Sequence, residues 1–401
     1  MKLNYRSITQ ISILAIGLFL GACASHKTTD ETRIWRVAIT DAKTPDIKIW
    51  DIEERDEVAV LKTASPARLG AGAKPMQFSV IQGSTGQLQL LDIGLVQENH
   101  GNHKHWVSGK PNLSAAVLTG SKPSHANPGV GKIAAFFDGD GIARVYTIDK
   151  LSAGAASPLE IKTAQPHHGI AIPLPKNQYL ISVPPAQGRL PTGIKLVDSM
   201  GNTLLNSPLC ENMHGDGHHN QLFLFSCANG VMVFDVSKNQ FNLIAYPASA
   251  GRAWHLLSSE KQALMIGDYG DSNLIIIDLK TMTMRSVNLP ANFLNYQWDE
   301  ENPQQVWTLL ETGELVAIDV TSATITQRAS VLPKWLKGDA DAEKNLPKPQ
   351  LAVAHGRVVV TDARTGQLHV MLTKNLTKSH SLAVGGQPSS LVMRSVNLDS
   401  D

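Results

Sequence analysis

The segment Lys132 to Asp149, KIAAFFDGDGIARVYTID, decides the fold class of this chain. An apolar run from Ile133 to Phe137 is followed by the turn Asp138-Gly139-Asp140-Gly141 and by a second run rich in apolar residues. Two such runs around a glycine-containing polar turn are typical of a β-hairpin. The segment therefore predicts a two-stranded unit that ends in an aspartate.

The same unit recurs along the chain, with polar turns at Cys227 to Gly230, Tyr269 to Asp271 and Glu311 to Gly313. A repeat of about 40 to 45 residues with several short strands indicates a β-propeller, because one such unit cannot bury its own faces. The residues that end the successive hairpins are Asp51, Asp92, Asp149, Asp198, Asp235, Asp278 and Asp319, with Leu372 at the eighth equivalent position.

A short marker segment, often containing Pro, precedes most hairpins. The first hairpin, Arg36 to Asp51, has no marker before it, and the last marker, Gln387 to Ser390, has no hairpin after it. Strands from the two chain ends should therefore share one blade and close the ring. The sequence predicts an all-β fold, a single β-propeller over residues 34–398, with eight blades favoured and seven as the alternative.

The innermost strand of each blade borders the central channel, so the marker positions should form a ring around the axis. Four consecutive markers end in histidine: His125, His168, His214 and His255. Neutral imidazole is a common ligand of zinc, which binds three or four N, S or O donors. The eight positions are Gln77, His125, His168, His214, His255, Trp298, Leu351 and Ser390.

Four adjacent blades span a wide arc for one ion, so we expect two or three ring histidines and a further donor. His100, His103 and His105 lie in the long connection before the blade of His125, and we expect this loop to fold over the ring. His167 is an alternative ligand beside His168. A solvated loop and histidines that only bond to backbone are the competing interpretations.

The first 22 residues have the features of a lipoprotein signal peptide. Lys2 and Arg6 precede an apolar run from Ile11 to Ala22, which is too short to span a bilayer. The run leads to Cys23, the expected lipidation site, and residues 23–33 form a polar tether. The alternative is ordinary signal-peptide cleavage. We expect a protein on the periplasmic side of a bacterial envelope, lipid-anchored, with the outer membrane favoured.

The remaining cysteines and the charge balance narrow the chemistry. Cys210 and Cys227 are predicted to form a disulfide, because an exported chain matures in an oxidising compartment. Zinc ligation by these thiolates is the alternative. With 36 basic and 35 acidic residues, the chain lacks the positive charge that nucleic-acid binding requires. Asp268 and Asp271 are candidates to orient imidazoles, or are turn residues only.

Three stretches carry a resemblance to a known family. Leu118 to His125, LTGSKPSH, Lys132 to Gly139, KIAAFFDG, and Pro166 to Pro173, PHHGIAIP, resemble the AztD family of periplasmic zinc metallochaperones. The arrangement of Cys210, His214-Gly215, Asn220, Phe225, Cys227 and Gly230 is similar too. The resemblance covers about residues 95–235. It implies a propeller, zinc binding through His125, His168 and His214, a loose match at His103 and His105, and direct transfer to a partner.

The function that we predict from these observations is a zinc metallochaperone. It would capture zinc at the propeller mouth and hand it to the solute-binding protein of an ABC zinc importer. The protein is expected to be a monomer and not an enzyme, since no nucleophile elbow, dinucleotide fingerprint or haem-attachment motif is present. The alternatives are a non-catalytic scaffold of the envelope and a propeller oxidoreductase.

Overall fold

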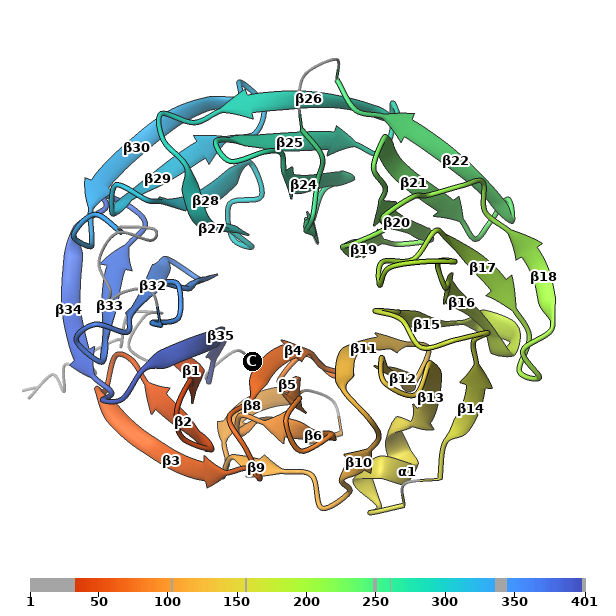
Figure 1. Cartoon of the computed structure of the whole chain (residues 1–401). Helices are drawn as coiled ribbons and strands as arrows, with labels where there is room; N and C mark the ends of the chain where they lie inside the picture. The colour runs from red at the N-terminus through yellow and green to blue at the C-terminus, as the bar shows by residue number, and fades with distance from the viewer. Residues whose placement is uncertain are drawn as a thin grey trace, which may run out of the picture.

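The computed structural model describes residues 33–101, 104–155, 157–247, 251–259, 261–335 and 345–398. These residues form eight antiparallel blades around a central axis, as Figure 1 shows, so the predicted eight-bladed all-β propeller is confirmed. Among the described residues, no helix combines the length and the apolar character needed to cross a membrane. The expected signal peptide and Cys23 lie outside them.

Blades 1 to 4 take their strands in the following order, with the outermost strand first in blades 1 and 2 and the innermost first in blades 3 and 4. Blade 1 contains β3 (Asp56–Lys62), β2 (Asp46–Asp51), β1 (Arg33–Asp41) and β35 (Pro388–Asn397). Blade 2 contains β10 (Leu118–Thr119), β6 (Gln87–Asp92), β5 (Gln77–Gln82) and β4 (Arg68–Ala71), and β9 (Asn112–Leu113) also pairs with β6. Blade 3 contains β11 (Pro123–Gly129), β12 (Lys132–Phe137), β13 (Ile142–Thr147) and β14 (Leu159–Lys162). Blade 4 contains β15 (Ala171–Leu174), β16 (Gln178–Val183), β17 (Gly193–Val197) and β18 (Thr203–Asn206).

Blades 5 to 8 list the innermost strand first. Blade 5 contains β19 (Asp216–His219), β20 (Leu222–Ser226), β21 (Gly230–Asp235) and β22 (Gln240–Ala245). Blade 6 contains β23 (Leu256–Ser258), β24 (Leu264–Asp268), β25 (Asn273–Asp278) and β26 (Thr283–Asn288). Blade 7 contains β27 (Phe293–Trp298), β28 (Gln305–Leu310), β29 (Glu314–Asp319) and β30 (Thr324–Ser330). Blade 8 contains β31 (Leu351–Ala354), β32 (Arg357–Asp362), β33 (Gln367–Leu372) and β34 (Lys378–Ala383).

Three short elements lie outside the blades. β7 (Leu95–Asn99) and β8 (Lys104–Ser108) form a separate two-stranded hairpin after β6. The helix α1 (Ile148–Ser152) follows β13, and the 3₁₀ turn η1 (Pro175–Asn177) joins β15 to β16.

The aspartates that end the third strands explain the repeat in the sequence. The carboxylate of Asp235 accepts a hydrogen bond from the N–H of Ser237 at 2.9 Å, and that of Asp278 from Lys280 at 2.8 Å. Asp319 makes the same bond to Thr321 at 3.0 Å. A short acid side chain that bonds to the backbone two residues later fixes a turn.

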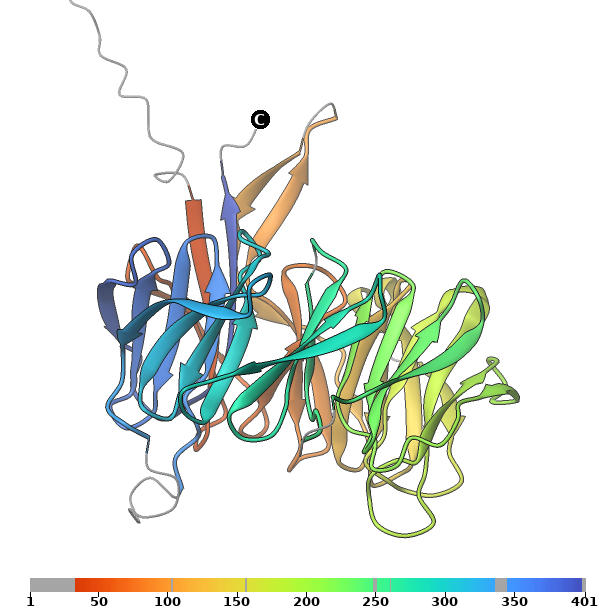
Figure 2. The same cartoon turned by 90° about the horizontal axis from the view of Figure 1, so that it is seen from above.

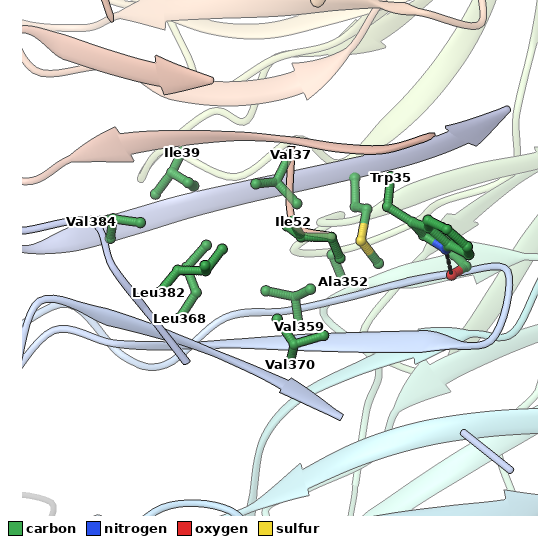
Figure 3. Packing of buried hydrophobic residues seen from close by; sticks show 12 residues of the cluster. Trp35, Val37, Ile39, Ile52, Ala352, Val359, Leu368, Val370, Leu382 and Val384 are labelled. Carbon is green, nitrogen blue, oxygen red and sulfur yellow. Dashed lines mark hydrogen bonds between the residues drawn. The ribbon is translucent and has the colours of Figure 1, made fainter. Parts of the chain in front are cut away.

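Strands from the two chain ends close the ring, as predicted. β35 pairs antiparallel with β1 from Arg33 opposite Asn397 to Asp41 opposite Pro388. Apolar side chains of blades 1 and 8 pack across this seam, with Trp35 at one end and Val384 at the other (Figure 3). The Trp35 indole N–H donates to the Ala354 carbonyl at 3.2 Å. The buried seam therefore holds both chain ends in place.

The beginnings of the inner strands lie together on one side of the propeller, which we call the start face. Near the beginning of β4, the Leu69 N–H donates to Ser390 Oγ of β35 at 3.1 Å. Arg68 in β4 donates to the Ser124 carbonyl of β11 at 2.9 Å. The inner strands thus run in the same direction, and they end on the opposite side, the end face.

Two ring positions predicted from the markers are wrong. Gln77 is the first residue of β5, the second strand of blade 2, because the short strand β4 precedes it as the inner strand. Trp298 is the last residue of β27 and lies toward the end face, where its indole N–H donates to the Leu257 carbonyl at 3.0 Å. The marker segment that ends at Trp298 is therefore part of the inner strand β27 and does not precede it.

The hairpin β7–β8 stands on the end face, and this corrects the expectation that the loop folds over the histidine ring. The third strand of a blade runs in the same direction as the first, so the segment after β6 emerges where the inner strands end. At its base, Arg36 of β1 donates to the Gly94 carbonyl and to Ser108 Oγ, both at 2.8 Å. Figure 2 shows the hairpin projecting on the side of the C-terminal end of β35.

The two cysteines form the predicted disulfide. Cys210 and Cys227 are bonded, and both are fully buried. The bond ties the segment that leads into β19 to the turn after β20. Because both sulfur atoms are in this bond, they do not bind zinc as thiolates. The bond instead cross-links the chain beside His214.

Candidate metal site on the start face

Four imidazoles follow one another around the start face, each from the beginning of a different inner strand. His125 is the third residue of β11, His168 precedes β15, His214 precedes β19 and His255 precedes β23. The ring centres of successive pairs are 4.9, 5.4 and 5.6 Å apart. The propeller thus brings together side chains that are far apart in the sequence.

The closest pair is His125 and His168, whose Nε2 atoms are 3.2 Å apart. Burial, and to a smaller extent the neighbouring His168, lower the pKa of His125 to about 3. His125 is therefore neutral at pH 7. Burial also lowers the pKa of His214, despite the hydrogen bond from its ring to the Trp254 carbonyl.

A buried carboxylate orients His168. The Nδ1–H of His168 donates to Asp138 Oδ2 at 2.7 Å. The other carboxylate oxygen accepts from the Ser124 hydroxyl and, at 3.3 Å, from the Gly169 N–H. Burial alone would raise the pKa of Asp138, but the hydrogen bonds from His168, Ser124 and Gly169 lower it below the ordinary value. Asp138 stays ionised and fixes the imidazole.

The next two imidazoles are oriented through the same ring nitrogen. His214 Nδ1–H donates to the Trp254 carbonyl at 2.8 Å, and His255 Nδ1–H donates to Asp268 Oδ2 at 3.0 Å. Asp268 Oδ1 accepts from the backbone N–H groups of Trp254 and His255 at 2.6 and 2.8 Å. Gly215 permits this approach, because a Cβ there would lie 2.2 Å from the Trp254 carbonyl oxygen.

In the neutral form of each of these three imidazoles, the hydrogen bond places the proton on Nδ1 and leaves the lone pair on Nε2. Such bonding of the distal nitrogen is the usual support of a metal-bound histidine. Two nitrogens held at about 2.0–2.1 Å by a tetrahedral ion are about 3.3 Å apart. The Nε2 atoms of His125 and His168, at 3.2 Å, already have that spacing.

The ring is nevertheless open in this geometry. Across the described residues, the one group of three or more His, Cys, Asp or Glu with all ligand atoms within 4.8 Å is Glu98, His100 and His105. A third ring ligand therefore has to move toward the His125–His168 pair to share an ion with it. His255 is the most exposed of the four ring histidines, with 68% of its side chain accessible to solvent.

A small cavity lies directly behind the first three ring histidines. Its volume is about 10 Å³, and it is lined by His125, His168, Ile170, Met213, His214, Gly215 and Asp216. Asp216, at the beginning of β19, also borders a larger cavity of about 300 Å³ in the channel. Burial raises the pKa of the Asp216 carboxyl to about 6.

The tip of the β7–β8 hairpin carries a second cluster, on the end face. Glu98 Oε2 is 3.4 Å from His100 Nε2 and 3.7 Å from His105 Nε2, and the two imidazole rings stack at 4.4 Å. Glu98 pairs directly with His105 across the two strands. His103 lies outside the described residues.

His167 is not directed into the ring. Its Nδ1 lies 3.0 Å from the Gln165 carbonyl and its Nε2 lies 2.8 Å from Ser182 Oγ, so both ring nitrogens have hydrogen-bond partners. The side chain is buried and packs edge-on against Phe136 at 5.1 Å. The geometry favours a structural role for His167.

The zinc chaperone AztD of Citrobacter koseri is 28% identical to this chain over 393 residues, which span 96% of this chain and 91% of AztD. The crystal structure of Citrobacter koseri AztD matches with a TM-score of 0.85 and 26% identity, over 92% of this chain and all of the other. The chain is similar to AztD in both sequence and fold.

The likeness to AztD extends to the apo structure from Citrobacter koseri. That structure matches with a TM-score of 0.81 and 26% identity, over 90% of this chain and 98% of the other. The dihydro-heme d1 dehydrogenase NirN matches at 0.62 with 11% identity, over 93% of this chain and 77% of its own, and so shares the fold alone. No protein-family model matches the chain.

Sequence reasoning missed three acidic residues near the two histidine clusters, Asp138, Glu98 and Asp216. Asp138 was assigned only to a turn, although its position beside Gly139 at the end of β12 puts it on the same face as the strand beginnings. Glu98 was passed over, although a hairpin centred on Gly101 sets it opposite His105. Asp216 carries no local signal, since its place behind the ring depends on the closure of the propeller. Asp268 was correctly named as a partner of an imidazole.

Proposed function

We propose that this protein is a periplasmic zinc chaperone that holds Zn²⁺ at the start face through His125, His168 and His214. The observation that carries this proposal is the fixed Nδ1–H of His168 and His214, which leaves Nε2 as the ring nitrogen that can bind a metal. Nε2 of His168 lies 3.2 Å from Nε2 of His125, the spacing of two ligands of one ion. The similarity to the zinc chaperone AztD supports the choice of cargo. Copper and nickel also accept imidazole, so metal supply and geometry decide between them.

The recipient in this proposal is the solute-binding protein of an ABC zinc importer. An open, ligand-exchanging site suits transfer better than a closed structural one. His255 stands next to His214 at 5.6 Å between ring centres, and its exposed imidazole is the member of the ring that a partner reaches first. AztD is a zinc chaperone, a role without catalysis, and we expect the same role here.

The hairpin cluster of Glu98, His100 and His105 is the second metal site of this proposal, and His103 remains a predicted ligand outside the described residues. Because the hairpin stands on the end face, it cannot share one ion with the ring. An exposed site of two imidazoles and one carboxylate should bind more weakly than the enclosed one, since water competes for each ligand.

Export and lipidation at Cys23 complete the proposal. The first described residue, Arg33, lies at the beginning of β1, which pairs with the last residues of β35 on the end face. Nine residues lie between Cys23 and Arg33, and the ten Cα–Cα steps span at most about 35 Å when fully extended. A lipid at Cys23 would therefore keep the end face nearer the membrane and leave the histidine ring directed away from it.

Zinc binding by tag-free protein at neutral pH tests the proposed function. Changing His125, His168 and His214 together to Ala should abolish high-affinity binding in competition with a chromophoric chelator. A matched variant with His218, His219 and His380 changed to Ala should keep it, because those side chains lie outside both clusters. No high-affinity binding by the wild type, or full affinity in the ring variant, would reject the proposal.

A further inference from the structure

Among the described residues, no cationic side chain is paired with the carboxylate of Asp216. The residue is partly exposed, and it borders both the small cavity of the ring histidines and the larger cavity in the channel. In the described part of the chain, the hydrogen-bond donor to this carboxylate is its own backbone N–H. A partly buried carboxylate without a compensating charge or full hydrogen bonding is costly to the fold, so its presence calls for an explanation.

The other carboxylates near the ring are already engaged. Both oxygens of Asp138 accept hydrogen bonds, from His168 on one side and from Ser124 and Gly169 on the other. Both oxygens of Asp268 are bonded to the His255 ring and to two backbone N–H groups. Asp216 is thus the acid at this site whose lone pairs are left for a cation.

The cavity that Asp216 shares with the histidines fits one small guest. A volume of about 10 Å³ is close to that of a single water-sized sphere, which is also the scale of one metal ion. Three of the residues around it are the proposed zinc ligands. Three neutral imidazoles leave the full double charge of Zn²⁺ uncompensated, whereas one carboxylate halves it.

We propose that Asp216 is the fourth zinc ligand, and that its carboxylate closes a three-histidine, one-carboxylate site from the channel side. This inference rests on the proposed function. Tetrahedral zinc accepts nitrogen and carboxylate oxygen at nearly the same distance, about 2.0–2.2 Å. Zinc binding draws the carboxylate and the His214 ring toward the His125–His168 pair and gives the acid its missing counter-charge.

The first test compares Asp216→Asn with the matched variant Glu211→Gln, which removes an exposed acid from the segment leading into the same strand. Losing a supporting partner of a metal ligand lowers affinity about 10- to 100-fold, and losing Asp216 should cost at least as much. Glu211→Gln should bind zinc as the wild type does. Without metal, Asp216→Asn should melt no lower than the wild type, and added zinc should raise its melting temperature less.

The second test asks whether residue 216 reaches the metal. In Asp216→Cys loaded with Co²⁺, a thiolate ligand gives near-ultraviolet charge-transfer absorption, and Glu211→Cys should show none. Wild-type zinc affinity in Asp216→Asn, or no such absorption in Asp216→Cys that binds Co²⁺, would overturn the inference and leave the chaperone proposal intact. Failure of the wild type to bind zinc would overturn both.

Discussion

His125 has the strongest constraint on its charge among the ring histidines. Metal binding needs neutral imidazole, and a histidine with a depressed pKa has no proton to lose at pH 7. His125 and His214, both with lowered pKa, are thus in the form that our proposed zinc site requires. Asp138 and Asp268 take the different task of fixing His168 and His255 through Nδ1.

The low pKa of His125 predicts how the metal-free protein responds to pH. The unfolded chain binds a proton at this histidine below about pH 6.5, while the folded chain does so only near pH 3, so folding stability falls as pH is lowered through that window. In His125→Gln, urea denaturation should show a smaller loss of stability between pH 7 and pH 5 than in the wild type. An equal loss in both proteins would show that His125 titrates normally.

Asp138→Asn tests the supporting role of the second carboxylate. The change keeps the size of the side chain but weakens its hold on the His168 Nδ1–H, so zinc affinity should fall about 10- to 100-fold with the fold retained. Chelator competition measures the affinity and circular dichroism reports the fold. Asp140→Asn, in the same turn, is the control, and an equal effect in both variants would assign the loss to the turn.

Blade hairpins were predictable from the sequence, because each depends on a local turn and on an aspartate that bonds to its own neighbours. The inner strands were harder to predict from the sequence. Gln77 and Trp298 were misplaced because β4 is only four residues long and because strand β27 itself resembles a lead-in segment. The face of the β7–β8 hairpin follows from strand direction, since the third strand of a blade runs parallel to the first.

The position of the hairpin predicts two metal sites that act separately. In the double variant His100→Ala with His105→Ala, titration calorimetry should no longer detect the weaker zinc equivalent. The tight equivalent should keep its affinity, because the hairpin cluster and the histidine ring lie on opposite faces of the propeller. His219→Ala with His380→Ala serves as the control. A drop in the tight affinity of the hairpin variant would mean that the loop contributes to the ring site.

At the scale of the whole molecule, closure of the propeller creates the site. The seam between β1 and β35 closes the circle, and residues from the neighbouring blades 3, 4 and 5 line one cavity. Sequence could identify the four histidines by their register but not the depth at which Asp216 lies behind them. Local sequence patterns predict the strands, whereas the arrangement of the blades around the ring decides which side chains lie close enough to bind one ion.

The account depends most on the claim that imidazoles of three blades bind one ion. Anomalous diffraction at the zinc edge, on crystals of zinc-loaded protein, tests it directly. We predict one strong peak on the start face, within bonding distance of Nε2 of His125, His168 and His214. A peak confined to the hairpin, or none near these three nitrogens, would contradict the account.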